Sequence, residues 1–236
     1  ERFLVLGAEY SRDTLSLFDN AGTRIAEVDV TSRTADLALG MEVGGNAEIR
    51  LIYARGYATV DEQIGQPVAP EGAVHQGGIA LQLVRDSLDD TFFPRSGGFA
   101  GLRGRFERDG LGSDRSFDSV TGLALGTESW KGLTLTGLLY AHAVTSGNPG
   151  IENAVRLGGF RRLSAYAPGE ITGDNALMAS AYASQSFGGP LVPWFVGIGF
   201  EAGNAWPSLG AASWDSSVKS SSVFAGEIGR ASCRER

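Results

Sequence analysis

The sequence predicts an all-β protein, an antiparallel transmembrane β-barrel that is incomplete, with about 11–12 of 16 strands in a curled open sheet. Three observations lead to this fold class. Apolar and polar residues alternate with period two along most of the chain, several alternating segments run for about ten residues or more, and the polar face carries charges of both signs in mid-strand. A mean hydropathy of −0.05 is typical of strands with one apolar and one polar face.

The alternation is clearest between residues 46 and 56. Ala47, Ile49, Leu51 and Tyr53 fall on one face of an extended chain, while charged residues fall on the other. We expect the uncharged face to contact lipid and the charged face to line an aqueous lumen. The segments with this pattern are 25–30 (Ala26, Val28 and Val30 opposite Glu27 and Asp29), 36–43, 46–56, 78–86, 98–107, 117–128, 131–144, 175–187 and 194–203.

Strand length separates a membrane barrel from a soluble β-sandwich. Soluble strands usually have about five or six residues, whereas a tilted strand needs about 9–11 to cross a bilayer. Short connections (44–45 and 130–132) and long ones (61–75, 87–97 and 146–174) predict turns on one side and external loops on the other. Aromatic residues near strand ends or on the apolar face suit interfacial girdles: Tyr10, Tyr53, Tyr57, Phe106, Tyr140, Trp194 and Phe200. A soluble β-rich binding module remains the alternative.

Composition argues against several function classes. The 236 residues carry a net charge of −7 and only two lysines, so we expect no nucleic-acid partner. His75 and His142 have no Cys, His or carboxylate at ligand spacing, and no G-x-S-x-G nucleophile elbow occurs, so we expect no metal, no cofactor and no catalytic residues in this segment.

Both ends suggest a piece of a longer protein. Residues 228–236, with the single Cys233, are basic and apolar-poor and resemble the translated sequence of a sequencing adapter. We therefore expect residues 1–227 to form the barrel domain and residues 228–236 to be non-native. The N-terminal residues do not have the pattern of a signal peptide.

A charged stretch between two predicted strands forms the first motif. Pro94 removes a ladder donor, Gly97 permits a turn, and three carboxylates, Asp86, Asp89 and Asp90, are placed to pair with Arg95. The stretch 85–97 resembles a signature of the bacterial surface-antigen barrel superfamily, which comprises outer-membrane assembly and secretion pores.

The second motif, residues 155–166, resembles the R-G-F loop of that superfamily, a long external loop that folds into the lumen. The position of the family arginine is Gly158 here, followed by Gly159 and Phe160. The resemblance implies a contact with an acidic strand motif, present as Phe200-Glu201-Ala202-Gly203. We expect Arg161 or Arg162 to supply the guanidinium that pairs with Glu201.

A third resemblance narrows the family. Residues 15–30, 39–50 and 55–56 are similar to the barrel of patatin-like phospholipases fused to a surface-antigen barrel, and the match spans about residues 3–226. It implies an outer-membrane barrel that anchors a lipid acyl hydrolase lying outside this chain. A barrel of an outer-membrane protein assembly or translocation factor is the alternative. The implied partners are outer-membrane lipid and the barrel-assembly machinery for insertion, and homodimerisation is left open.

Overall fold

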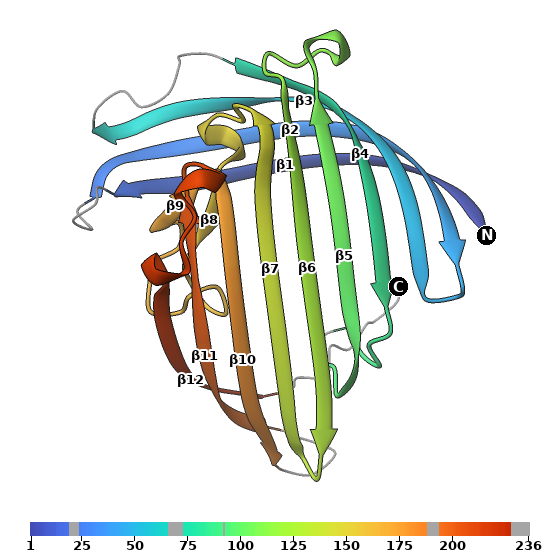
Figure 1. Cartoon of the computed structure of the whole chain (residues 1–236), viewed down its shortest axis with the longest axis vertical. Helices are drawn as coiled ribbons and strands as arrows, with labels where there is room; N and C mark the ends of the chain where they lie inside the picture. Colours follow the sequence, from blue (N-terminus) through green and yellow to red (C-terminus); the bar gives the residue numbers. More distant parts are fainter. Residues whose placement is uncertain (19–23, 66–72, 92, 188–193, 228–236) are drawn as a thin grey trace, which may run out of the picture.

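One strongly curled antiparallel sheet dominates the computed structural model, which describes residues 1–18, 24–65, 73–91, 93–187 and 194–227. Its strand order is β1-β2-β3-β4-β5-β6-β7-β10-β11-β12, so all neighbouring strands except β7 and β10 are also consecutive along the chain. The sheet curls, so that β1–β3 run across the view of Figure 1 while β5–β7 run from top to bottom. A second sheet is the short hairpin β8–β9, inserted between β7 and β10.

The strands of the large sheet are β1 (Arg2–Phe18), β2 (Arg24–Val43), β3 (Ala47–Gly65), β4 (Ala73–Asp86), β5 (Ser96–Glu107), β6 (Phe117–Trp130), β7 (Leu133–Gly147), β10 (Asn175–Phe187), β11 (Trp194–Trp206) and β12 (Val218–Glu227). The hairpin consists of β8 (Val155–Leu157) and β9 (Ile171–Gly173), and four 3-10 turns complete the elements: η1 (Asp109–Leu111), η2 (Ile151–Asn153), η3 (Leu209–Ala211) and η4 (Trp214–Ser216).

The predicted fold class is confirmed, with one difference in the use of the strands. The described residues form twelve strands, but ten belong to the sheet and two belong to a loop that folds against it. β1 and β12 each pair with one neighbour only, so the sheet is open in the described part of the chain. Within the predicted long connection 61–75, the described residues belong to strands, because β3 continues to Gly65 and β4 begins at Ala73.

The lower halves of the strands have the predicted two faces. In the paired row Leu4, Leu39, Leu51 and Leu81, all four side chains point outward, and Leu39 and Leu51 are 59% and 50% exposed. The opposite face carries charged and polar side chains such as Arg50, Gln82 and Arg103, which point to the concave side. A monomer in water would not expose so long a row of leucines, whereas acyl chains solvate it.

Above this apolar belt the polarity of β1–β3 reverses. In the upper part of β2, Val28 and Val30 point to the concave side and are buried with Ala58 and Val60, while Asp29 points outward and pairs with Arg12 at 2.7 Å. The expectation that the uncharged side contacts lipid is therefore wrong for 25–30. With 17 to 20 residues, β1–β3 are longer than a bilayer requires, so their upper ends extend into water.

The connections are arranged with the expected asymmetry. Turns at 44–46 and 131–132 lie at one end of the strands, and the connections 108–116, 148–174 and 207–217 lie at the other. The connection 87–95 is the exception, because it lies at the short-turn end.

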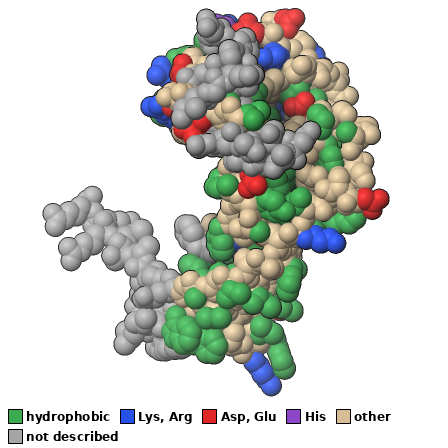
Figure 2. Space-filling view, turned by 90° about the vertical axis from the view of Figure 1, so that its left-hand side faces the viewer, with side chains coloured by type: hydrophobic (Ala, Val, Ile, Leu, Met, Phe, Trp, Pro, Cys, Tyr) green, Lys and Arg blue, Asp and Glu red, His purple; other side chains and the backbone are tan. Residues whose placement is uncertain are grey.

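Figure 2 shows charged side chains gathered toward the top of the view and hydrophobic side chains below. Helical turns are short throughout the described ranges, and none could serve as a membrane-crossing helix.

We expect Leu51→Arg to destabilise the folded barrel in lipid vesicles by ~2–4 kcal/mol, because Leu51 lies midway between the β2–β3 turn and the upper edge of the belt. Urea unfolding of the intact protein measures this change. Gln82→Arg on the concave face is the matched control and is expected to have little effect. Equal losses for both variants would contradict the assignment of the faces.

Candidate functional site

The connection between β7 and β10 folds against the concave side of the sheet, and we call residues 148–174 the inner loop. Val155 and Leu157 of β8 and Leu163 are buried against Ala176 and Met178 of β10. β8 and β9 both contact β11. The apolar side chains of the hairpin thus fasten the inner loop to the wall, as expected for a long loop that folds into the lumen.

The second motif forms a tight turn in which backbone conformation is unusual. Gly158, Gly159, Arg161 and Leu163 all have positive φ, at 117°, 90°, 62° and 74°. A side chain at Gly158 would place its Cβ 2.0 Å from the carbonyl oxygen of Ala167. In this conformation of the turn only glycine fits at position 158, and the arginine expected from the family pattern would not be accommodated.

Glu201 anchors this turn, but not through the predicted arginines. The carboxylate of Glu201 is buried and accepts hydrogen bonds from the backbone N–H of Ser164 and the hydroxyl of Tyr182, each at 2.5 Å. The prediction that Arg161 or Arg162 pairs with Glu201 is wrong. The left-handed backbone at Arg161 and Leu163 turns the N–H of Ser164 toward the carboxylate instead.

The two arginines make other contacts. The Arg161 guanidinium lies over the ring of Tyr182, 4.6 Å from its centroid, and Arg162 donates to the carbonyl of Arg156. Ser220 of β12 accepts a further backbone N–H, from Ala165. Tyr182 and Ser220 are not among the residues predicted from the sequence, although both lie on the lumen face of their strands, as their register with Glu201 shows.

Phe160 begins a column of aromatic rings on the concave side. Its ring lies edge-on to Phe224 at 5.9 Å, Phe224 contacts Phe195 at 6.1 Å, and Phe195 contacts Phe93 at 6.1 Å. Gly197 leaves room for Phe224, because a Cβ there would lie 2.4 Å from that ring. The column joins the tip of the inner loop to the connection 87–95.

The other residues of the predicted strand motif do not join this column. Phe200 points outward and is 62% exposed, and Gly203 is buried opposite Met178.

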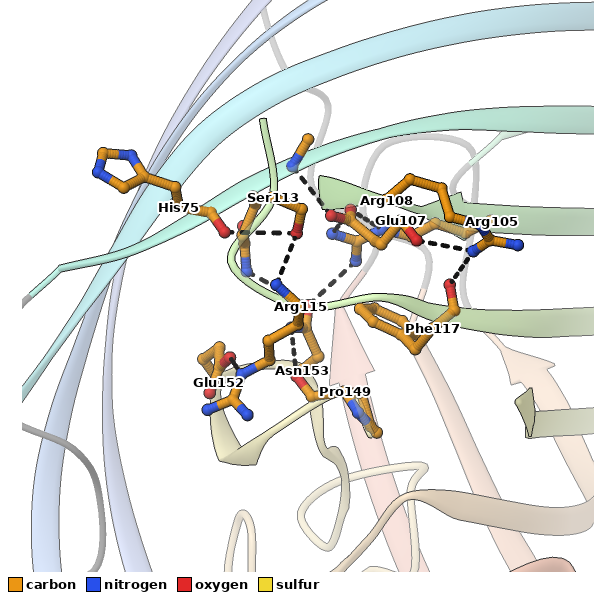
Figure 3. Close-up of polar contacts among 12 residues, drawn as sticks. His75, Arg105, Glu107, Arg108, Ser113, Arg115, Phe117, Pro149, Glu152 and Asn153 are labelled. Carbon is orange, nitrogen blue, oxygen red and sulfur yellow. Dashed lines mark hydrogen bonds and ion pairs between the residues drawn. The ribbon is translucent and has the colours of Figure 1, made fainter. Parts of the chain in front are cut away.

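A second set of contacts clamps the start of the inner loop (Figure 3). Arg105 of β5 pairs with the buried Glu107 at 2.5 Å and donates to the side-chain oxygen of Asn153 at 3.0 Å. Gln76 donates to the same oxygen at 3.3 Å. The second carboxylate oxygen of Glu107 accepts the backbone N–H of Gly77 at 2.9 Å. Arg105 and Gln76, on strands of the large sheet, thus hold η2 through the side chain of Asn153.

Arg115 completes this clamp from the connection between β5 and β6. Its guanidinium pairs with Glu152 of η2 at 2.6 Å, and the Glu152 side chain is only 1% exposed. Both residues lie in loops without periodicity, so no sequence signal indicated them. The sequence predicted two members of this cluster, because alternation along residues 98–107 places Arg105 and Glu107 on the lumen face.

The first motif is a turn held by carboxylates that accept backbone N–H groups. Asp89 accepts from Arg95 at 2.8 Å and Ser96 at 3.0 Å, Asp86 from Leu88, and Asp90 from Phe93. Asp86 and Asp89 form no ion pair with the Arg95 guanidinium in the described part of the chain, so the predicted pairing is wrong for these two. Pro94 lies just before β5, and Gly97 has φ 100°, with Ser87 too close for a side chain.

The polar groups of the site hold the inner loop through hydrogen bonds and ion pairs. His142 lies on the lumen face, within 2.8 Å of the Thr121 hydroxyl, and His75 points outward at the upper end of β4. The described residues contain no group of three His, Cys, Asp or Glu side chains that could hold a metal ion. The charged groups that hold the start of the inner loop form ion pairs with one another, Arg105 with Glu107 and Arg115 with Glu152.

Comparison with known proteins now identifies the family. Residues 5–222 match the Omp85 superfamily domain. The chain belongs to the Omp85 superfamily. A solved structure, "The crystal structure of BamA from Haemophilus ducreyi lacking POTRA domains 1-3", is similar at 14% sequence identity with a TM-score of 0.63. The alignment covers 86% of this chain and 47% of that chain, so the present chain spans about half of that protein. A search of curated proteins found no match.

These findings make the chain an Omp85 barrel of the bacterial outer membrane, which confirms the predicted fold class and location. The surface-antigen resemblance is confirmed at the level of the superfamily. Nothing in the comparisons shows a patatin-like phospholipase. Residues 228–236 lie outside the described residues, so the prediction that they are non-native stays a prediction.

We expect Tyr182→Phe to loosen the turn at 158–164, because it removes one of the two hydrogen bonds to a buried carboxylate, a loss of about 1–3 kcal/mol. Limited proteolysis of the intact protein with trypsin, which cleaves after Arg161 and Arg162, should become about tenfold faster. Tyr166→Phe removes a hydroxyl with no hydrogen bond among the described residues and is the control. An unchanged rate for Tyr182→Phe would contradict the role of this hydroxyl.

The turn at Asp89 should depend on pH. Hydrogen bonds from the backbone N–H groups of Ser96 and Arg95 lower the pKa of Asp89. A lowered folded-state pKa means that this stabilisation is present above the unfolded value of about 3.9 and is lost as pH falls through the folded value. Hydrogen-exchange protection of these two amides should therefore decrease below about pH 4, and Asp89→Asn should remove that dependence. A pH-independent wild type would contradict this mechanism.

Proposed function

We propose that this barrel is the membrane domain of an outer-membrane protein assembly or translocation factor. The observation that carries the proposal is an inner loop held inside an Omp85 barrel at two separate places, by Glu201 and Ser220 below and by Arg105 and Arg115 above. A barrel that served only as an anchor would need a filled or closed interior, but would not need a long polar latch. The BamA likeness supports the fold of such a factor.

The ion pairs that hold η2, Arg105–Glu107 and Arg115–Glu152, suit an inner loop that occludes the lumen and can be released from the wall. Glu107 and Glu152 are buried, so removing the arginine partner of either would leave a buried carboxylate without its counter-charge. Both arginine side chains remain partly exposed, Arg115 at 26% and Arg105 at 32%, so water reaches them. A polypeptide in the lumen could compete for these cations and for the amide of Asn153.

The alternative in which the barrel anchors a patatin-like hydrolase rests on residues 15–56 and on Gly158. The close contact of Gly158 with the Ala167 carbonyl gives a local steric reason for that glycine, which weakens it as a marker of the phospholipase branch. Sequence upstream of Glu1 distinguishes the two: serial periplasmic repeats support assembly or translocation, and a G-x-S-x-G elbow supports the hydrolase. In either case we propose that the barrel itself is not an enzyme.

The functional test uses the intact protein in proteoliposomes with an unfolded outer-membrane barrel as substrate. Wild-type protein should accelerate insertion or translocation of the substrate over empty liposomes. Arg115→Gln should change that rate several-fold and raise single-channel conductance, because it leaves the buried Glu152 unpaired and removes one of the two attachments of η2. Arg50→Gln breaks the lumen-facing Arg50–Glu48 pair, which does not contact the inner loop, and is the matched control. No acceleration by wild-type protein would refute the proposal.

A further inference from the structure

A row of four outward-pointing side chains crosses β1 to β4 at the upper edge of the apolar belt. Strand register pairs Tyr10 with Arg33, Arg33 with Tyr57, and Tyr57 with His75. The Arg33 guanidinium lies 5.7 Å from the ring centroids of both tyrosines, and it donates to the Tyr57 hydroxyl at 2.7 Å. The ring centroids of Tyr57 and His75 are 6.4 Å apart, and the rings meet edge to face.

Arg33 lacks a carboxylate partner among the described residues, unlike the arginine one row above it. Arg12 points to the same side but is neutralised by Asp29, which also accepts from the Thr14 hydroxyl. Asp61 lies opposite Asp29 in the same upper layer, four residues along β3 from Tyr57, about 13 Å away. The positive charge of Arg33 is therefore held in place by aromatic rings and is not cancelled.

A second outward arginine adds to this charge. Arg55 lies two residues below Tyr57 on β3, diagonal to Arg33 across the strand pair, and forms no ion pair in the described part of the chain. Its guanidinium lies against the backbone of the β5–β6 connection, since a Cβ on Gly112 would lie 2.8 Å from its Cζ. Asp114, in the same connection, accepts the backbone N–H of His75 at 2.7 Å.

The height of these arginines on the strands indicates what they meet. Directly below them the outward face is Leu6, Leu37 and Tyr53, which belong to the apolar belt, and above them it is charged. The row also lies at the end of the long connections, which is the external side of a bacterial barrel. Tyrosine at this height is typical of the membrane–water interface, where lipid headgroups lie.

We propose that Arg33, held between Tyr10 and Tyr57, binds with Arg55 the phosphate of a lipid headgroup in the external leaflet. The planar guanidinium offers paired N–H donors that match phosphate oxygens, and the ring faces keep it oriented before the lipid arrives. The neighbouring belt accommodates the acyl chains of the same lipid. The charge of the site, its height and its unpaired guanidinium groups all favour an anionic lipid over a protein partner.

Native mass spectrometry of the intact protein, released from detergent with added lipid, tests this site. Dioleoyl phosphatidic acid is the probe and dioleoyl phosphatidylcholine is the comparison lipid. Wild-type protein should retain phosphatidic acid at least threefold better than phosphatidylcholine. Arg33→Gln should abolish most of that preference, and Arg55→Gln should reduce it by a smaller factor.

Arg12→Gln is the matched control, because it removes an outward arginine of the same face that is already ion-paired. It should leave the preference unchanged. Equal retention of the two lipids by wild-type protein would overturn the proposal and needs no variant, so a folding defect cannot obscure the result. The proposal would also be overturned by an unchanged preference in Arg33→Gln, or by loss of the preference when free inorganic phosphate is added at equal concentration.

Discussion

Every backbone N–H and C=O of a chain in hydrocarbon must find a partner within the protein, and the rest of this structure depends on that constraint. The ten-stranded antiparallel ladder meets it by pairing each strand with its neighbours. Once the chain is extended, side chains alternate between two faces, so a leucine row outside leaves the inner face available for charged and small residues. Charges such as Arg50 and Arg103 are tolerated because they face the concave side.

Small residues on the concave side give the inner loop its place. Gly197 and Gly199 leave space for the rings of Phe224 and Tyr182, and Gly158 allows the loop backbone to approach its own Ala167 carbonyl. Around these close contacts, three buried carboxylates, Glu107, Glu152 and Glu201, accept hydrogen bonds or pair with arginine. The loop is thus joined to the wall by polar groups whose loss would leave a charge without a partner, which favours all of these contacts forming together.

The outer surface is also divided into layers, an apolar one that faces lipid and a charged one above it that faces water. Below the row of Tyr10, Arg33 and Tyr57 the outward residues are mainly apolar, with Arg55 at the upper edge of the belt. Above the row, Arg12, Thr14 and Asp29 form their own hydrogen-bonded group. In the upper layer the valines of β2 and β3 turn inward and pack together. One strand therefore serves two solvents, lipid below and water above, without a break in its ladder.

The sequence by itself determined the fold class, the strand parity and the superfamily resemblance, because period-two alternation and the motifs at 85–97 and 155–166 are local properties of the chain. Only the tertiary structure decided which groups meet. Residues far apart in sequence, such as Ser164 and Glu201 or Arg115 and Glu152, come together through the curl of the sheet and the folding of a loop, and no local pattern records them. The inward turn of Val28 and Val30 shows the same limit: alternation gives two faces, but the height of a residue relative to the membrane decides which face is dry.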